Sequence, residues 1–265
     1  RTSGVSDDEA ARFLREHAHY RDDIAFWGAQ AARLGSPVLD LGAAAGRITV
    51  PLARGGAEVW ALDGSEQMVT EIIRAAASQP ADVRARIHPV HADMRTFDLD
   101  RSFRLVMIAM NTLQALTTPD DQLACLRAVE RHQADDGELI FDVALPDPVE
   151  IADSMGVERS GGEYRDPVSG TVLAHSAWYD AWDPVSQTLE FTHRIRETTP
   201  DGGRHEFLRH HTVHLFMPAE MEHLLARAGL RTVGCLASSM VVQTARLHEI
   251  RRADVAARPW SKYGG

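Results

Sequence analysis

Short apolar runs that end in acidic or small residues recur along the first 145 positions of the chain. They lie at residues 38–41, 57–63, 87–92, 103–110 and 138–143. The run at 103–110 is almost continuously apolar, which is typical of a strand buried on both faces of a parallel sheet. The pattern predicts an α/β core. Its other elements are a helix at 48–54 after the first strand, a helix at 219–228 that ends at Gly229, and two final strands at 231–236 and 240–247.

The segment between the fifth strand and the last helix is too long for a plain crossover. Stretches rich in β-branched and aromatic residues at 171–182, 187–198 and 204–216 are separated by turn sequences and predict an inserted three-stranded antiparallel meander. Apolar positions at helical spacing in residues 6–33 predict one or two helices ahead of the core. The expected organisation is a helical lid at 1–36, a seven-stranded Rossmann-like core at 37–150 and 217–250, and a β cap at 151–216.

Small residues form the turn after the first strand, so backbone N–H groups can approach a ligand and the next helix can present its N-terminus. A dinucleotide-binding turn has glycine at its first, third and sixth positions, where this chain has Gly42, Ala44 and Arg47. Asp40 precedes the turn, and its carboxylate would repel a pyrophosphate. An acid here suits a ligand with an ammonium group, such as S-adenosylmethionine.

The segment D-L-G-A-A-A-G resembles the first motif of class I S-adenosylmethionine-dependent methyltransferases, usually E/D-x-G-x-G-x-G. Ala44 departs from the middle glycine, so either its φ is below zero or the loop is reshaped. By the resemblance, Asp63 binds the ribose hydroxyls, Asp93 binds the adenine amino group, and the backbone of Met94 meets the ring. The cofactor residues implied in this way are Tyr20, Asp40, Gly42, Ala43, Ala44, Gly46, Arg47, Asp63, Gly64, Met68, Asp93, Met94, Met110 and Asn111.

Nearly the whole chain is similar to a narrower group, the bacterial natural-product N-methyltransferases that act on amino sugars and glycopeptide antibiotics. The similarity implies that Tyr20 lies near the transferring methyl group and that the cap pairs two chains in a homodimer. It implies acceptor contacts from Trp27, Gln114 and Trp178. In the amino-sugar enzymes a histidine follows the fourth strand, whereas this chain has Ala115 there, which cannot act as a base.

The absence of a histidine at position 115 helps to predict whether the methyl group is transferred to nitrogen or to oxygen. Methyl transfer from a sulfonium depends mainly on alignment, and deprotonating an amine costs only about 1.4 kcal/mol per pKa unit, whereas an alcohol needs a general base. The sequence therefore favours nitrogen over oxygen. Among the remaining proton acceptors, His211 is preferred over His17 and His19.

Four histidines crowd one predicted strand, namely His205, His210, His211 and His214. Positions four residues apart on the same face of a strand are separated by roughly 13 Å, too far to share one ion. No metal is expected.

Net charge and cysteine content indicate which kinds of substrate and cellular location to expect. A net charge of −10 with scattered arginines argues against a nucleic-acid substrate and favours a small molecule. The sequence shows no apolar run of membrane-spanning length and no leader pattern, and Cys125 and Cys235 are expected to be buried thiols, so a cytoplasmic location without a membrane is predicted. Three other functions stay open: an O-methyltransferase, a methyltransferase-like protein that binds the cofactor without transfer, and an NAD-dependent oxidoreductase.

Overall fold

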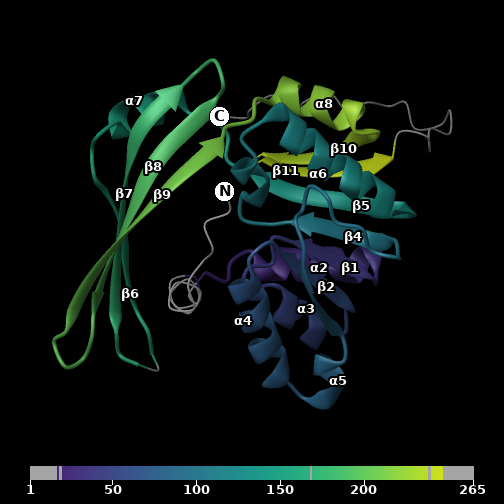
Figure 1. Cartoon of the computed structure of the whole chain (residues 1–265), viewed down its shortest axis with the longest axis horizontal. Helices are drawn as coiled ribbons and strands as arrows, with labels where there is room; N and C mark the ends of the chain where they lie inside the picture. The colour runs from purple at the N-terminus through teal and green to yellow at the C-terminus, as the bar shows by residue number, and fades with distance from the viewer. Residues whose placement is uncertain (1–16, 18–19, 168, 238–239, 247–265) are drawn as a thin grey trace.

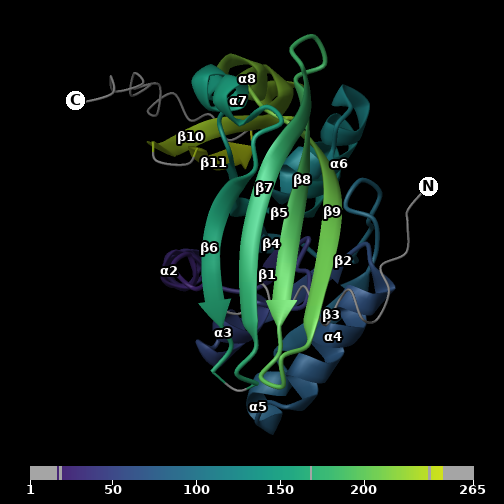
Figure 2. The ribbon, with the colours of Figure 1, turned by 90° about the vertical axis from the view of Figure 1, so that its left-hand side faces the viewer.

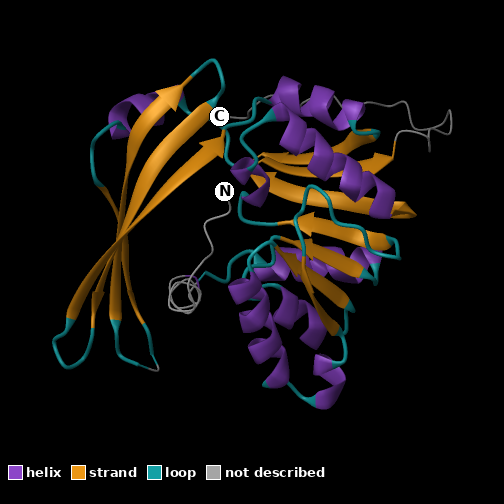
Figure 3. Cartoon of the chain, viewed as in Figure 1, coloured by secondary structure: helices purple, strands orange, loops and turns teal. Residues whose placement is uncertain are grey.

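The computed structural model describes residue 17 and residues 20–167, 169–237 and 240–246. Two separate sheets organise this part of the chain (Figures 1 and 3). The larger sheet has the strand order β10-β11-β5-β4-β1-β2-β3, and the smaller has the order β6-β7-β8-β9. The α/β Rossmann-like class and the separate antiparallel sheet agree with the sequence prediction.

The larger sheet, which we call the core sheet, has parallel pairing from β3 through β5 and an antiparallel hairpin at one edge. Its strands are β1 (Val38–Leu41), β2 (Val59–Asp63), β3 (Ile87–His91), β4 (Phe103–Ile108), β5 (Gln133–Val143), β10 (Leu230–Ala237) and β11 (Met240–Arg246). The chain runs outward from β1 to β3 and then returns to place β4 on the other side of β1. Ligands of open α/β sheets bind outside the carboxyl ends of the strands at such a reversal.

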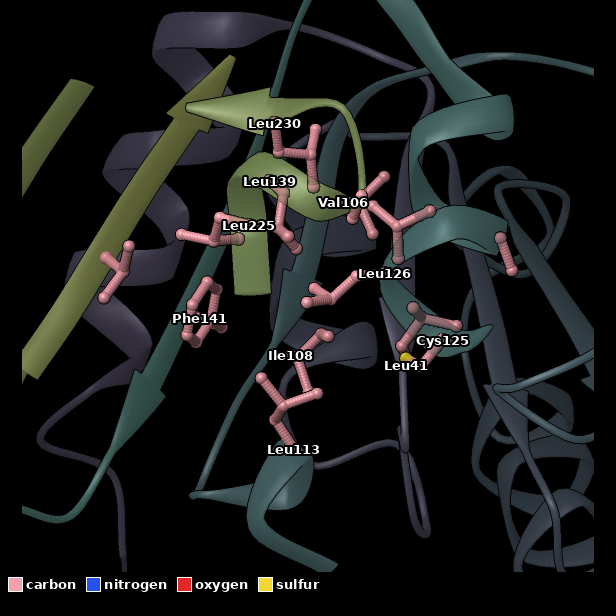
Figure 4. Packing of buried hydrophobic residues seen from close by; sticks show 14 of the residues in the cluster. Leu41, Val106, Ile108, Leu113, Cys125, Leu126, Leu139, Phe141, Leu225 and Leu230 are labelled. Carbon is pink, nitrogen blue, oxygen red and sulfur yellow. The ribbon is translucent and has the colours of Figure 1, made fainter. Parts of the chain in front are cut away.

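Helices cover both faces of the core sheet (Figure 1). They are α2 (Ile24–Leu34), α3 (Thr49–Arg54), α4 (Glu66–Ala77), α5 (Ala81–Arg84), α6 (Pro119–His132) and α8 (Pro218–Arg227), with a 3₁₀ turn η1 (Thr112–Ala115) after β4. Successive residues of β4 point to opposite faces: Val106 and Ile108 pack with α6 and α8, whereas Leu105 and Met107 pack with α2 and α3. Figure 4 shows the first of these clusters, in which the buried thiol of Cys125 has its pKa raised to about 12 by desolvation.

The position of α2 corrects the expected lid. Trp27, Ala31 and Leu34 are buried against the core sheet, so this helix belongs to the core. Of the expected lid, the described residues leave only the segment before α2 free to cover a ligand. Residues 1–16, His19 and the side chain of Cys235 lie outside the described residues.

The smaller sheet, which we call the cap, has four strands where the sequence predicted three. They are β6 (Arg159–Arg165), β7 (Val172–Asp183), β8 (Thr188–Thr198) and β9 (Arg204–His214), preceded by helix α7 (Pro148–Ser154). The additional strand, β6, is mostly exposed and contains Gly161 and Gly162, so no apolar alternation marks it; it forms through backbone pairing with β7. The cap stands on the side toward which the parallel strands point, and Figure 2 shows it in front of the core sheet.

Candidate functional site

The turn after β1 holds its backbone in the left-handed region at three positions. Gly42, Ala44 and Gly46 have φ values of 73°, 47° and 81°. The φ angle of Ala44 is therefore above zero. Of the two alternatives for a turn without its middle glycine, a negative φ at Ala44 is wrong. At Gly42, a Cβ atom would lie 2.4 Å from Cγ2 of Thr112, so close packing against η1 requires glycine here. The carboxyl end of β1 and the turn after β4 are thus in direct contact.

Asp63, at the end of β2, stabilises this turn. Its Oδ2 accepts the N–H of Ala44 at 2.8 Å, and its Oδ1 accepts the N–H of Ser65 at 2.9 Å. Burial raises the pKa of Asp63 above its usual value, while the two N–H donors act in the opposite direction. Each carboxylate oxygen can accept a second hydrogen bond, so the group is able to hold the turn and bind hydroxyls together.

Residues around Asp63 form a rigid end to β2. Gly64 is exposed, and Ser65 caps α4 by accepting the N–H of Met68 at 3.3 Å. The side chain of Met68 is buried against the core, as is that of Ala43.

Asp40, on β1, is buried and bonded within the protein. Its Oδ2 accepts the hydroxyl of Thr49 at 2.7 Å. Desolvation raises the pKa of Asp40 to about 6, with the Thr49 bond and the charge of Arg47 working against the rise and Asp63 and Asp23 adding to it. The sequence analysis identified Asp40 but not Thr49. The position of Thr49, about one helical turn after Gly46, could have indicated this contact.

Asp93 is paired with Arg95 in this structure. Its carboxylate accepts bonds from the Arg95 backbone at 2.8 Å and from the guanidinium at 2.5–3.1 Å, which lowers its pKa. Arg95 also contacts Asp121 of α6 at 2.9 Å. Met94 packs at the margin of the core. The pairing with Arg95 fixes the carboxylate of Asp93 beside β3. A basic residue two positions after the acid is the feature of the sequence that could have predicted this pair.

Arg47, which directly follows the β1 turn, holds Tyr20 in place. The guanidinium binds both carboxylate oxygens of Asp23, at 2.6 and 2.7 Å, donates to the carbonyl of Tyr20 at 3.1 Å, and lies 5.1 Å from the ring centroid of Tyr20. Both members of the ion pair are mostly buried, with side-chain exposures of 13% and 18%. Burial first, and then the negative charges of Asp23 and Asp142, raise the pKa of the Tyr20 hydroxyl.

Replacing Arg47 by methionine is expected to destabilise the protein by about 1–3 kcal/mol, because the carboxylate of Asp23 loses its charged partner in a mostly buried position. The segment before α2 should then be cleaved faster in limited proteolysis, and affinity for the cofactor should fall. Arg33→Met is the matched control: Arg33 forms an equally bidentate pair with Glu138, but at the surface, and its loss should cost under about 1 kcal/mol. Equal effects of the two variants would contradict the role of Arg47.

Two of the expected acceptor contacts are structural. Trp27 is 2% exposed and packs between α2 and the core sheet. Gln114 is also buried: its amide donates to the carbonyls of Ala144 and His214, and its Oε1 accepts the N–H of Ala144. Gln114 thereby ties η1 to the ends of β5 and β9. Because all its polar atoms are bonded within the chain, it is not available to an acceptor.

Trp178 and His211 lie on opposite faces of the cap. Cross-strand pairing puts Trp178 beside Thr192, and His211 beside Phe191 on the alternate face, where the rings stack at 4.7 Å. Trp178 instead lies under the guanidinium of Arg194, at 4.8 Å, and donates to Asp180. The two residues cannot line one pocket, so the expected acceptor contact by Trp178 is wrong if His211 faces the site.

The His211 face contains a second histidine pair that the sequence analysis missed. His175 and His193, on neighbouring strands, are bonded at 3.2 Å. Burial lowers the pKa of His193 to about 4, helped by the charges of His175, His211, Arg209 and His17, so this face lies close to the segment that carries Tyr20. Burial, Arg209 and His210 lower the pKa of His211 as well. Within the described residues, no three ligand-type side chains converge as a metal site would require.

The turn after β4 carries Met110 and Asn111, both exposed and both left-handed, with φ values of 56° and 58°. Their N–H groups donate to the two carboxylate oxygens of Asp142, at 2.8 and 3.0 Å. Sequence reasoning missed Asp142, although an acid near the end of an apolar strand is the signal that identified Asp63. The site therefore has acids at the ends of β1, β2 and β5, arranged around the turns that follow β1 and β4.

Comparison with known proteins shows which proteins this chain is similar to. A family model described as a methyltransferase domain matches residues 38–137. The cypemycin N-terminal methyltransferase of a Streptomyces species is 30% identical over 131 residues, which are 49% of this chain and 48% of that protein. The aligned part thus spans about half the length of that curated relative.

Solved structures are similar over most of the chain. The methyltransferase CcbJ from Streptomyces caelestis has a TM-score of 0.69 and 25% identity, with 86% of this chain and 97% of that chain covered. The amino pentose methyltransferase CalS10 from Micromonospora echinaspora, solved with S-adenosylmethionine bound, has a TM-score of 0.68 and 19% identity, with 93% and 99% covered. No helix in the described residues is long and apolar enough to cross a membrane.

Proposed function

Since residues 38–137 match a family model described as a methyltransferase domain, we propose that the protein is an S-adenosylmethionine-dependent methyltransferase that methylates a nitrogen of a small natural product. The acceptor is an amino sugar or a glycosylated or peptide antibiotic intermediate, and the donor leaves as S-adenosylhomocysteine. The observation that carries the proposal is the meeting of Asp63, the left-handed turn at Ala44 and the buried Asp40 at one end of the core sheet.

The charges of this end suit the donor. S-adenosylmethionine carries an ammonium and a sulfonium, and the carboxylates of Asp40, Asp63 and Asp142 lie at the ends of three strands of the core sheet. Asp63 offers free acceptor positions for ribose hydroxyls, and Asp93 offers a carboxylate beside β3 for the adenine amino group. A dinucleotide would bring its pyrophosphate against these acids, which argues against the oxidoreductase alternative.

Relatives support the acceptor class. The names of the similar proteins describe a cypemycin N-terminal methyltransferase and an amino pentose methyltransferase. Nitrogen as the acceptor atom follows from the chemistry: the amine lone pair attacks the methyl carbon, the C–S bond breaks, and the resulting ammonium then loses a proton. Such an acceptor needs alignment and a nearby proton acceptor, rather than a base that acts in the transition state.

His211 is the proton acceptor we propose. Its lowered pKa keeps the imidazole neutral at pH 7, so a ring nitrogen can take the proton that the acceptor ammonium must lose before its lone pair attacks. Its stacking on Phe191 fixes the ring on the cap face that lies close to Tyr20 and His17. The segment before α2 and the cap would then close the site from two sides.

His211→Ala is expected to lower the turnover rate and to flatten the acid limb of its pH profile, because protonation of the imidazole no longer limits the reaction. His205→Ala is the control: His205 lies on the same face six residues earlier, and its removal should leave the profile unchanged. A His211→Ala variant that loses stability but keeps the wild-type pH profile would show that the residue is structural.

The acceptor atom is tested by incubating the protein with S-adenosylmethionine and a panel of amine and hydroxyl compounds, followed by mass spectrometry. One added methyl group on an amine is the expected result. Transfer to oxygen or carbon alone would overturn the nitrogen assignment, and binding of S-adenosylhomocysteine without transfer to any pathway intermediate would favour the non-catalytic alternative.

We also propose a homodimer through the cap. Its outer strands, β6 and β9, have unpaired edges within the described residues, and Leu208 of β9 is 48% exposed. Light scattering after size-exclusion chromatography should give twice the chain mass of 29.2 kDa. A monomer at micromolar concentration would contradict this arrangement.

A further inference from the structure

The turn after β4 is held in a conformation that its residues do not favour. Met110 and Asn111 are consecutive left-handed residues, and left-handed backbone is uncommon for a long side chain such as that of methionine. Two such residues in sequence persist only where surrounding contacts determine them. The turn lies at the carboxyl end of β4, next to the reversal of strand order, and Gly42 of the β1 turn packs directly against the Thr112 that follows it.

One carboxylate accepts the N–H groups of both left-handed residues of this turn. Oδ1 of Asp142 accepts the N–H of Met110 at 2.8 Å, and Oδ2 accepts the N–H of Asn111 at 3.0 Å. The pairing of Ile108 with Phe141 brings the next residue of β5, Asp142, level with the start of the turn. Successive N–H groups that converge on one anion form a nest, and here the anion belongs to the protein itself.

Asp142 also faces the segment that carries Tyr20. The charge of Asp142 acts on the hydroxyl of Tyr20, and the charge of Asp23 acts on Asp142, so the three groups are within electrostatic range of one another. The side chain of Asp142 keeps partial exposure, as do Met110 and Asn111. Asp142 therefore binds the β4 turn directly and acts electrostatically on Tyr20, the residue proposed to cover the transferring methyl group.

We propose that Asp142 is a positioning residue for methyl transfer: its carboxylate fixes the left-handed turn at Met110 and Asn111, so that this turn holds the donor methyl and the acceptor amine in line. The inference rests on the proposed function, since it names the group that sets the alignment. Asp142 acts through the backbone of Met110 and Asn111. Loss of its carboxylate should therefore affect the rate at saturation more than the binding of the acceptor. In-line alignment accounts for much of the rate of such a displacement, and small displacements are costly.

Asp142→Asn tests this role. The amide has the same shape but replaces one oxygen by a donor, so one of the two N–H groups of the turn loses its acceptor. We expect kcat to fall about tenfold or more while KM for the acceptor changes by less than about threefold. Hydrogen exchange should become faster at the amides of Met110 and Asn111. Asp183→Asn is the matched control, because Asp183 likewise accepts a backbone N–H, from Val185 at 2.9 Å, in the distant β7–β8 turn.

A double-mutant cycle separates positioning from a general loss of stability. Glycine adopts left-handed backbone without strain, so in a Met110→Gly background the Asp142→Asn change should cost less kcat than in the wild type. An equal cost in both backgrounds, or a kcat for Asp142→Asn no lower than that of Asp183→Asn, would overturn the proposal. If the wild type itself methylates no amine, the proposed function fails; the positioning role alone fails when wild-type transfer is intact and Asp142→Asn transfers equally well.

Discussion

Asp63→Ala is expected to weaken the binding of S-adenosylhomocysteine by about 1–3 kcal/mol, a loss of roughly 5- to 150-fold, as measured by calorimetry. The change removes the proposed acceptor of the ribose hydroxyls and also the oxygen that accepts the N–H of Ala44. Ser65→Ala is the matched control, since it removes the neighbouring helix cap without touching the carboxylate.

An analogue with a 2′-deoxyribose distinguishes the two roles of Asp63. The wild type should bind the deoxy analogue more weakly than S-adenosylhomocysteine, whereas the Asp63→Ala variant should bind the two ligands almost equally. A variant that folds and keeps wild-type affinity for S-adenosylhomocysteine would show that Asp63 is not a cofactor ligand.

Asp40→Asn is expected to stabilise the ligand-free protein at pH 7 while weakening its binding of S-adenosylmethionine. Burial raises the pKa of Asp40 to about 6, so the folded protein disfavours the charged form. The cost is absent below the pKa of the unfolded chain, near 4; it develops as the pH rises toward 6 and is complete above that. At pH 7 it is on the order of 2–3 kcal/mol, which the neutral amide avoids.

The pH dependence makes this prediction specific. Thermal unfolding should show a higher midpoint for Asp40→Asn than for the wild type at pH 7, and nearly equal midpoints at about pH 3, below the pKa of the unfolded chain. Asp98→Asn is the control, because the side chain of Asp98 is 97% exposed, so this change removes a carboxylate without relieving any burial. A uniform stabilisation at both pH values would contradict the linkage. Unchanged affinity for S-adenosylmethionine would contradict a role of the charge in holding the donor.

Together, the two predictions describe a site that is destabilised by its own carboxylate. Thr49 donates one hydrogen bond to Asp40, which offsets only part of the desolvation. A buried carboxylate at this position favours the binding of a cation at the cost of stability. Ligand binding should therefore raise the unfolding midpoint more in the wild type than in Asp40→Asn.

Local features of the sequence determined the core strands and the acids at their ends. The run at 103–110 predicts β4 because both faces of the strand are buried, and Asp40, Asp63 and Asp93 could be identified because each follows or interrupts an apolar run. The small-residue turn at 42–46 identified the ligand-binding end before any contact was known. These signals depend on residues that are near one another in the chain.

Only the tertiary structure decided the roles that depend on distant contacts. Trp27 and Gln114 resemble ligand contacts in sequence, but the packing of α2 and the bonds to Ala144 and His214 make them structural. The opposite faces of Trp178 and His211 follow from the pairing register of three strands, and the anchoring of Met110 by Asp142 joins residues 32 positions apart. A strand pattern specifies which positions alternate, whereas the partner that each position meets is set by how β4, β5 and the cap come together in space.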